Sequence, residues 1–390
     1  MPLHMTCARL QPLSVSTLTD ASFKCIAVCT VGELFGGVER HVLEMASSLQ
    51  ARSISSLFFL FHDGELAAQA RQRGIELIIL PDSNRFLLST SKQLAGVLES
   101  RNVRIVHAHG YKAMVFCAIA RRKYRFALVK TEHGLPEKTP GKPIEALRSH
   151  FYHLFDAAAT RLSNATVCCV TTELLAQHSG SSTRQARLIP NGISGMDRGD
   201  LPPPREFRSK RFNLAAVGRL DPVKALDVAI DALSAQGMPR DVELYLVGTG
   251  PCEGELRARA KAAGLSERVH FLGFRRDAHS FIAHCDALLM PSLHEGLPYT
   301  LLEAMALGTP VIASRVGGLA EVLQNEVTGL LVAPRDAGAL ADAVRRLYED
   351  HLLRTQLGEA ARRVQQARYS LDAMTKGYLQ LYAELQREMH

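Results

Sequence analysis

Two cations stand close together just after a predicted strand in the second half of the chain. Arg219 and Lys224 belong to the stretch 217–224 (VGRLDPVK), which precedes a predicted helix over 225–235. The free N–H groups and the dipole at a helix N-terminus favour an anion there. Two cations beside that terminus suit a diphosphate, such as the leaving group of a sugar nucleotide, whereas a solvated surface turn is the alternative.

Two carboxylates eight positions apart follow in the stretch 291–310 (PSLHEGLPYTLLEAMALGTP). Glu295 falls in a predicted loop and can reach a sugar hydroxyl, while Glu303 falls on the next predicted helix and can accept both hydroxyls of a ribose. Backbone N–H groups at Gly296 and Leu297 can meet a phosphate. A solvated glutamate pair is the alternative, but Glu303 stands among apolar neighbours, where an unused charge is costly.

Paired glycines, Gly36-Gly37, lie between a predicted strand at 24–29 and a predicted helix at 38–49. They allow positive φ angles and a close approach of the backbone to a ligand, although an ordinary tight turn has the same sequence. Gly248 also follows a strand, but neither region has the G-x-G-x-x-G spacing, so no dinucleotide site is predicted.

Histidines end two neighbouring predicted strands in the first half. His109 follows the strand at 105–108 in the sequence HAHG, and His133 follows the strand at 127–130 in TEHG. We therefore expect imidazoles to line one edge of the sheet, with His109 hydrogen-bonded to a sugar and His107 in the core behind it.

No metal site is predicted. The spacing of His107 and His109 would suit two ligands on one strand, but no cysteine or carboxylate cluster completes the set. The pair His294-Glu295 does not continue as H-E-x-x-H because residue 298 is proline, and no D-x-D triplet ends a strand.

Short apolar runs alternate with amphipathic segments along the chain after residue 23. The predicted strands cover 24–29, 56–61, 76–80, 105–108, 127–130 and 166–170 in the first half, and 212–217, 242–247, 269–271, 287–290, 311–313 and 329–332 in the second. Such alternation predicts an α/β fold of two tandem Rossmann-like, doubly wound parallel-sheet domains. The carboxyl ends of their strands are expected to face each other across a cleft, because ligands bind at those ends.

A stretch rich in proline and charge, 189–211 (IPNGISGMDRGDLPPPREFRSKR), interrupts the pattern and predicts a linker with a hinge near Asn191. We therefore expect a flexible tail over 1–23, a first domain over 24–192 that binds the acceptor, and a second domain over 193–370 that binds the donor.

The composition is that of a globular cytoplasmic protein. The 390 residues are 47% hydrophobic and 22% charged, which excludes disordered, collagen-like and coiled-coil chains. No apolar run approaches the roughly 18 residues needed to span a bilayer, and the first residues do not resemble a signal peptide. The eight cysteines lack a C-x-x-C pair, so buried thiols in a reducing cytoplasm are expected.

Positive charge is concentrated in the first half of the chain, which carries all of the excess behind the net charge of +7. One basic cluster consists of Arg121, Arg122, Lys123, Arg125 and Lys130, and the next predicted helix interleaves Lys142, Arg148, His150 and Arg161 with Phe151, Tyr152, Leu154 and Phe155. Basic and aromatic side chains on one helix suit the anionic inner face of the cytoplasmic membrane, whereas a solvated face over a core stripe is the alternative. No nucleic-acid-binding motif accompanies the charge, so nucleic acid is not an expected partner.

Several motifs in this order resemble the glycosyltransferases of family 4, which have the GT-B fold. They are GGVERH at 36–41, HAHG at 107–110, TEHG at 131–134, IPNG at 189–192, VGRLxxxK at 217–224 and, above all, E-x7-E at 295–303 followed by GTPVIAS at 308–314. The resemblance implies a retaining enzyme that uses a nucleotide-diphospho sugar. It also implies that the last segment, 371–390, crosses back onto the first domain.

The resemblance further assigns roles to individual residues. Arg219 and Lys224 would hold the diphosphate, Glu303 the ribose and Glu295 the donor sugar, with His109 at the reacting centre. The other donor contacts are expected at Gly36, Gly37, Gly218, Gly248, Gly273, Phe274, Gly296 and Leu297, and the acceptor contacts at Tyr111, Thr131 and His133. Cations and a helix terminus would neutralise the leaving group, so no metal or other cofactor is expected. Ala225 departs from the family, which often has glycine there, and we expect it to preserve the helix start.

We therefore expect a hexosyltransferase that glycosylates a hydroxyl of a glycan or polyprenyl-lipid-linked acceptor in bacterial surface polysaccharide assembly. The expected mechanism is front-face displacement, in which the departing β-phosphate takes the acceptor proton. Two other classes share the two-domain architecture. A sugar-nucleotide 2-epimerase would release isomerised sugar without an acceptor, and a non-catalytic nucleotide-sugar-binding module would bind the donor without turning it over.

Overall fold

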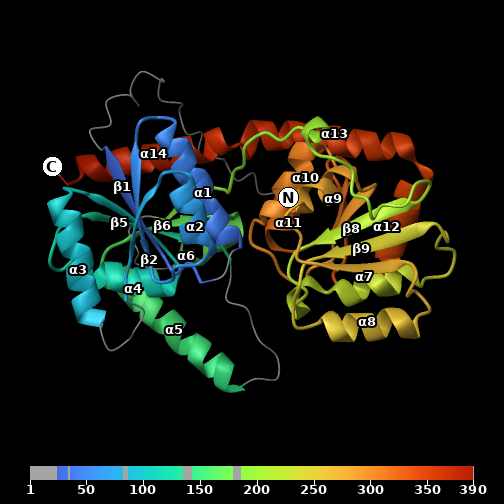
Figure 1. Cartoon of the computed structure of the whole chain (residues 1–390), viewed down its shortest axis with the longest axis horizontal. Helices are drawn as coiled ribbons and strands as arrows, with labels where there is room; N and C mark the ends of the chain where they lie inside the picture. The colour runs from blue at the N-terminus through green and yellow to red at the C-terminus, as the bar shows by residue number, and fades with distance from the viewer. Residues whose placement is uncertain (1–23, 34–35, 82–86, 135–142, 179–185, 390) are drawn as a thin grey trace, which may run out of the picture.

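The computed structural model describes residues 24–33, 36–81, 87–134, 143–178 and 186–389, so the tail expected over 1–23 lies outside the described residues. Two wholly parallel sheets, one in each half of the chain, form the centres of two domains (Figure 1). Helices cover both faces of each sheet, because every strand is flanked by crossover helices. The predicted pair of doubly wound α/β domains is confirmed.

The first sheet has the strand order β3-β2-β1-β4-β5-β6-β7. Its strands are β1 (Cys25–Thr30), β2 (Ser55–Leu60), β3 (Glu76–Ile79), β4 (Ile105–His109), β5 (Ala127–Glu132), β6 (Thr166–Cys169) and β7 (Ala186–Leu188). The sequence reading missed β7, because this edge strand is short and Arg187 and Leu188 are exposed, so it has no buried apolar run.

Alternate residues of β1 belong to different cores. Ile26 and Val28 face a cluster built with α1 (Gly37–Gln50) and α2 (Glu65–Gln72), while Ala27 and Cys29 face the opposite layer. That opposite layer contains α3 (Leu87–Ser100), α4 (Tyr111–Ala120) and α5 (Pro143–Leu162), and α6 (Thr172–His178) follows β6. Burial on both faces explains why the strands are continuously apolar.

The second sheet has the order β10-β9-β8-β11-β12-β13. Its strands are β8 (Phe212–Val217), β9 (Val242–Val247), β10 (Val269–Gly273), β11 (Ala287–Met290), β12 (Val311–Ser314) and β13 (Leu330–Val332). Its helices are α7 (Leu226–Leu233), α8 (Glu253–Ala262), α9 (Ala278–His284), α10 (Tyr299–Leu307), α11 (Gly317–Val322), α12 (Ala337–Glu349) and α13 (His351–Arg368).

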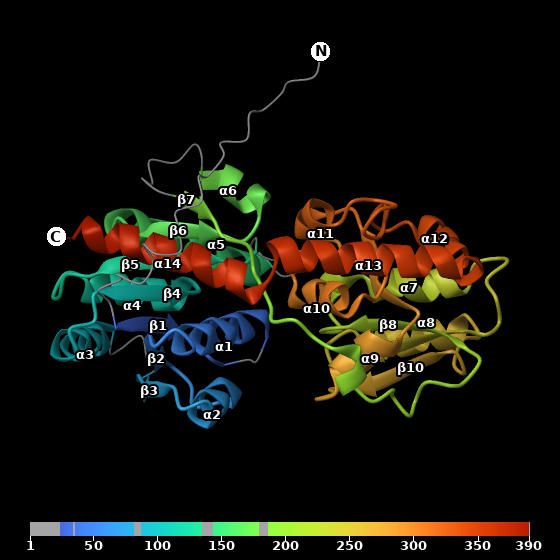
Figure 2. The same ribbon diagram turned by 90° about the horizontal axis from the view of Figure 1, so that it is seen from above.

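The chain passes between the domains twice, and the two passages are bonded to each other. The N–H of Ile193 donates to the carbonyl of Tyr369 (3.0 Å), and the N–H of Leu371 donates to the carbonyl of Ile193 (2.8 Å). The last helix, α14 (Leu371–Arg387), then lies on the first domain, where Tyr378 and Tyr382 are fully buried. Figure 2 shows α13 and α14 following one another along one side of both domains.

Candidate functional site

Three strand ends of the second sheet meet through their glycines. The N–H of Gly248 donates to the carbonyl of Gly273 (2.8 Å), and a Cβ at Gly248 would lie 1.9 Å from the carbonyl oxygen of Gly218. Gly248 has a φ of +143°, which side-chain-bearing residues rarely adopt. These glycines therefore let the loops after β8, β9 and β10 touch, and Phe274, directly after β10, is 74% exposed there.

Lys224 and Glu295 form an ion pair at the carboxyl edge of this sheet. The Lys224 Nζ lies 2.7 Å from Glu295 Oε1, which also accepts the hydroxyl of Ser292 at 2.7 Å. Their loops are joined through the backbone, because the N–H of Leu293 donates to the carbonyl of Val223 (2.8 Å). The cation and the loop carboxylate predicted from the sequence are thus brought into contact.

Arg219 extends from the same edge but is less constrained. Its side chain is 62% exposed, and its Nε lies 3.4 Å from Asp221 Oδ2. Ala225 ends the turn that carries Lys224 and has a φ of +46°, a left-handed conformation in which glycine is favoured. Ala225, which replaces the glycine common in the resembled family, therefore carries local backbone strain at the N-cap of α7.

Glu303 is held by a residue of the other domain. This carboxylate on α10 is 3% exposed, and it forms an ion pair with Arg40 of α1. His279 Nε2 lies 3.5 Å from the same carboxylate and 2.9 Å from Arg40 Nη2. Arg40 also lies over the ring of Tyr299, 5.6 Å from its centre. The carboxylate assigned to ribose therefore faces the first domain and is already paired.

The glycine pair at the start of α1, Gly36-Gly37, does not have the expected backbone conformation. Gly36 is the extended N-cap residue with a φ of −148°, and neither Gly36 nor Gly37 has a positive φ. The N–H of Gly36 donates to Glu39 Oε2 (3.0 Å), which caps the helix. Close approach does not require glycine here either, because a Cβ at Gly37 would lie 3.8 Å from the ring of Tyr299, which is an ordinary van der Waals distance.

Four histidines gather at the carboxyl edge of the first sheet. His41 of α1 lies with its ring centre 5.3 Å from that of His109 and 4.9 Å from that of His133, and the rings of His107 and His109 are 4.2 Å apart. His109 Nδ1 and His133 Nε2 share a hydrogen bond of 3.0 Å, whereas the buried Nε2 atoms of His41 and His109 have no hydrogen-bond partner among the described residues.

Burial keeps this cluster neutral at physiological pH. It lowers the pKa of His41 to about 4. Burial, reinforced by the charges of the neighbouring histidines, also holds the pKa of His107, His109 and His133 well below the usual value. The imidazoles can therefore orient a hydroxyl as neutral donors or acceptors but cannot serve as cations.

His107 and Thr131 lie inside the first domain. His107 Nδ1 bonds the hydroxyl of Tyr382 and its Nε2 bonds the hydroxyl of Thr131, both at 2.7 Å, and Thr131 also meets the hydroxyl of Tyr378 at 3.0 Å. Thr131 is 2% exposed with its hydroxyl engaged on both sides. The predicted contact of Thr131 with an acceptor is therefore wrong, since this residue instead ties α14 to the strand that carries His107.

Asn191, at the first passage between the domains, joins the two sides of the site. Its Oδ1 meets His41 Nδ1 at 3.0 Å, and its Nδ2 donates to the carbonyl of Leu297 at 2.8 Å. A Cβ at Gly296 would lie 2.0 Å from the carbonyl oxygen of His133, so the donor loop can approach the first domain only with glycine there. The histidine cluster and the Glu295 loop are thus in direct contact.

Sequence reasoning gave no role to Arg40, His41 or His279. Arg40 and His41 belong to the GGVERH motif, but the motif alone did not indicate what either side chain contacts. They are neighbours on α1, yet Arg40 pairs with Glu303 and His41 bonds Asn191. His279 had no signal, because it stands on a short helix outside every motif. The predicted acceptor contact Tyr111 is 41% exposed and stacks on Tyr152 with ring centres 4.7 Å apart.

Two groups of described side chains have the proximity that a metal ion needs. The ligand atoms of His41, His109 and His133 lie within 4.8 Å of one another, as do those of Glu132, Cys169 and His178. In the second group Glu132 is bonded to His178 (2.7 Å), and burial and the Glu132 charge raise the pKa of the Cys169 thiol to about 12. That thiol is therefore protonated at neutral pH.

The basic surface of the first domain is smaller than expected. Lys130 is 5% exposed and pairs with Glu132 (2.8 Å) and Asp156 (2.5 Å), so its predicted place on the surface is wrong. Phe151, Leu154 and Phe155 of α5 are all more than half exposed. Lys142 and the side chains of Arg148 and His150 lie outside the described residues. Over the described part of the chain, no helix is both long enough and apolar enough to span a bilayer.

Comparison with known proteins covers both domains. A family model described as Glycosyltransferase Family 4 matches residues 35–194, and one described as Glycosyl transferases group 1 matches residues 197–364. The lipopolysaccharide core biosynthesis glycosyltransferase LpsE of Rhizobium meliloti (strain 1021) is 32% identical over 205 residues, which are 51% of this chain and 58% of the relative. The chain spans about half the length of several curated relatives that it matches.

A longer but weaker match is to the N-acetyl-alpha-D-glucosaminyl L-malate synthase of Bacillus anthracis, 25% identical over 304 residues, with 77% of this chain and 80% of the relative covered. The crystal structure of Anabaena Alr3699/HepE in complex with UDP superposes with a TM-score of 0.77 at 24% identity, covering 93% of this chain and 100% of that one. The architecture is therefore the GT-B fold, with the first domain matched by the Glycosyltransferase Family 4 model and the second by the Glycosyl transferases group 1 model.

Proposed function

We propose that this protein transfers a sugar from a nucleotide-diphospho sugar to a hydroxyl of a glycan or lipid-linked acceptor. The observation that carries the proposal is the Lys224–Glu295 pair at the edge of the second sheet, with the buried Glu303 on the helix that follows the same loop. Lys224 and the exposed Arg219 hold the diphosphate, Glu303 takes the ribose hydroxyls, and Glu295 contacts the donor sugar.

The context of the proposal is bacterial surface polysaccharide assembly. A relative is named as a lipopolysaccharide core glycosyltransferase, and a structural neighbour was solved with UDP and with UDP-glucose. These names support a nucleotide-sugar donor and a bacterial glycan or polyprenyl-linked acceptor for this chain, with a hexose as the transferred group.

The proposed mechanism retains the anomeric configuration by front-face displacement. The bond between the anomeric carbon and the β-phosphate oxygen breaks, the acceptor oxygen bonds to that carbon on the same face, and the acceptor proton passes to the departing phosphate. Lys224 and Arg219 stabilise the charge that develops on the diphosphate. His109, neutral because of its burial, orients a sugar hydroxyl through Nε2, the nitrogen that finds no hydrogen-bond partner in the described part of the chain.

The same cations replace a metal ion in this proposal. Charge on the leaving group is balanced by two side chains and by the N-terminus of a helix, so turnover is expected to survive a chelator. Loss of activity in the chelator, with recovery on adding one divalent metal, would show that this part of the proposal is wrong.

The test of function is a panel of UDP-, GDP- and ADP-sugars, with slow donor hydrolysis and transfer as readouts. Arg219→Ala with Lys224→Ala is expected to abolish turnover while the unfolding transition is retained. Lys261→Ala, an exposed lysine on α8, is the matched control and should behave as wild type. Near-normal turnover by the double variant would refute the assignment. Isomerised free sugar would indicate a 2-epimerase, and binding without any turnover would indicate a binding module.

We also propose that the first domain contacts an anionic membrane from the cytoplasmic side. Support comes from the exposed apolar side chains of α5 and from the exposed Arg122 and Lys123. Pelleting with anionic vesicles at low salt should fall when the charges from Arg121 to Arg125 are reversed. Unchanged pelleting would remove the electrostatic part of this proposal.

A further inference from the structure

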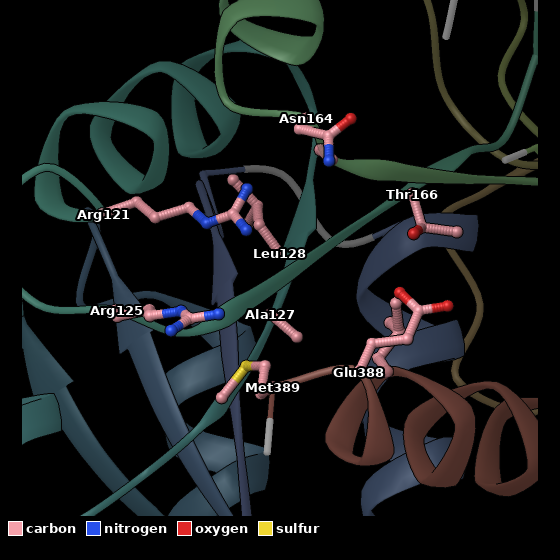
Figure 3. A pocket seen from close by; sticks show the side chains of 10 residues that line it. Arg121, Arg125, Ala127, Leu128, Asn164, Thr166, Glu388 and Met389 are labelled. Atoms are coloured by element: carbon pink, nitrogen blue, oxygen red, sulfur yellow. The ribbon is translucent and has the colours of Figure 1, made fainter. Parts of the chain in front are cut away.

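A pocket of about 410 Å³ opens at the edge of the first sheet that lies opposite the functional site. Ala127, the first residue of β5, and Thr166, the first residue of β6, both line it. The histidine cluster stands at the other ends of the neighbouring strands. Arg121, Arg125, Asn164 and Glu388 contribute the other polar side chains (Figure 3).

Two arginines that point into this pocket have no counterion among the described residues. Figure 3 shows both guanidinium groups directed inward, with Glu388 on the facing wall. Across the residues that the structure describes, the side chains of Arg121 and Arg125 make no hydrogen bond and no ion pair. Other arginines of the protein find a carboxylate, as Arg71 does with Asp63 (2.6 Å) and Arg259 with Asp231 (2.5 Å).

The electrostatics of Arg121 favour a nearby anion. Arg121 is half-buried, and burial together with the charge of Arg125 lowers its pKa. Because Arg125 is exposed, the cost falls on the half-buried Arg121, and an anion beside both guanidinium groups would offset it. Arg121 also ends α4 as its C-cap residue, where the helix dipole favours a cation.

Apart from the Glu388 carboxylate on the facing wall, the remaining polar groups can donate to an anion with several acceptor oxygens. Guanidinium groups bind phosphate with two parallel N–H donors, and the amide of Asn164 and the hydroxyl of Thr166 line the same pocket as neutral donors. We propose that this pocket binds a phosphate group. Its geometry is independent of the sugar-nucleotide site, so the proposal does not rest on the proposed function.

A phosphate group could reach this pocket from two sources. One is a free phosphorylated molecule in solution. The other is a phospholipid headgroup, for which Leu162, 87% exposed and two positions before Asn164, offers apolar surface nearby. The two arginines would recognise the same phosphate group in either case. Binding to phospholipid vesicles distinguishes the headgroup from the free molecule.

The experiment compares the full-length protein with two double variants. Arg121→Gln with Arg125→Gln removes both charges from the pocket, whereas Arg122→Gln with Lys123→Gln removes two charges from the same turn at residues that do not line it. The unfolding transition of each variant is measured first. Binding of inorganic phosphate and of pyrophosphate is then measured by calorimetry and by the shift of the unfolding temperature.

Saturable binding is expected for wild type and for the Arg122/Lys123 control, with an affinity at least about tenfold weaker in the Arg121/Arg125 variant. Hydrolysis of the nucleotide sugar should be equal in all three proteins. Absence of phosphate and pyrophosphate binding by the wild type, or equal binding by the Arg121/Arg125 variant, would overturn the proposal.

Vesicles of phosphatidylcholine alone and of phosphatidylcholine mixed with phosphatidic acid complete the test. Pelleting with the phosphatidic acid vesicles that falls further in the Arg121/Arg125 variant than in the Arg122/Lys123 variant, and that free phosphate reduces, would support the lipid source. If both double variants pellet to the same extent while only the Arg121/Arg125 variant loses phosphate binding, the result would support a free phosphorylated molecule as the ligand.

Discussion

Replacing Arg40 by alanine removes the guanidinium that pairs with Glu303 from the opposite domain. The carboxylate is only 4% exposed at its side chain and Arg40 is 29% exposed, so the pair is largely shielded from solvent. Removing one partner of a buried ion pair leaves an uncompensated charge and costs about 3–5 kcal/mol. We expect the lower end, about 3 kcal/mol, because His279 remains 3.5 Å from the carboxylate.

The protonation of His279 sets the pH dependence of this loss. Burial and the charge of Arg40 lower the pKa of His279 to about 4, so the ring is neutral while Arg40 is present. Without Arg40 the repulsion disappears and the attraction of Glu303 remains, which raises the pKa of the ring. Protonated His279 then compensates Glu303, so the destabilisation should be smaller at about pH 6 than at about pH 8.

The assay is urea unfolding at both pH values, with Arg71→Ala as the control. Arg71 pairs with Asp63 on the surface, where both side chains are at least half exposed, and its loss should cost less than about 1 kcal/mol. If Arg40→Ala stays within about 1 kcal/mol of wild type, the pair does not stabilise the domain interface and the reasoning is refuted. If Glu303 takes the ribose, Arg40 competes with the nucleotide, and the variant should bind nucleotide more tightly.

Three further predictions concern the histidine cluster, a strand-end glycine and the hinge. Because the pKa of His41 is about 4 in the folded protein, unfolding takes up a proton below about pH 6.5, and the free energy of unfolding should fall with falling pH by up to about 1.4 kcal/mol per pH unit for each such histidine. A free energy of urea unfolding that stays constant between about pH 7 and pH 5 would contradict this. Gly248→Ala should destabilise by about 3 kcal/mol or more, since its Cβ would lie 1.9 Å from a carbonyl oxygen, whereas Gly254→Ala, with open space around it, should be neutral or stabilising; equal thermal transitions would refute the close contact. Asn191→Leu leaves the carbonyl of Leu297 and His41 Nδ1 unpaired, so a loss of about 2 kcal/mol with slower turnover is expected, and unchanged unfolding and rate would argue against the link between domains.

The alternation of strands and helices made the two sheets predictable. Buried parallel strands have continuous apolar runs, so β1 or β9 could be placed to within a residue or so, whereas the exposed edge strand β7 could not. Glu295 and Lys224 could be grouped in advance because both follow neighbouring strands of one sheet, whose carboxyl ends meet at one edge.

Contacts between the domains could not be predicted from the sequence. The pairing of Arg40 with Glu303 depends on how two separate sheets are placed against each other, and no periodicity within either domain encodes that placement. Thr131 was misassigned for a related reason, because its hydroxyl is occupied by Tyr378 from a helix almost 250 positions later in the chain. The positive φ angles suggested by the Gly36-Gly37 pair are absent at both residues, because paired glycines permit such angles without requiring them.

The central claim is that the second domain binds a diphosphate through Lys224 and Arg219, and calorimetry with paired nucleotides tests it most directly. UDP, GDP and ADP are each compared with their monophosphates, in wild type and in Arg219→Gln with Lys224→Gln. The account predicts that the preferred diphosphate binds wild type at least about tenfold more tightly than its monophosphate, and that the double variant loses this difference. Equal affinities in wild type, or a difference that persists in the double variant, would contradict it.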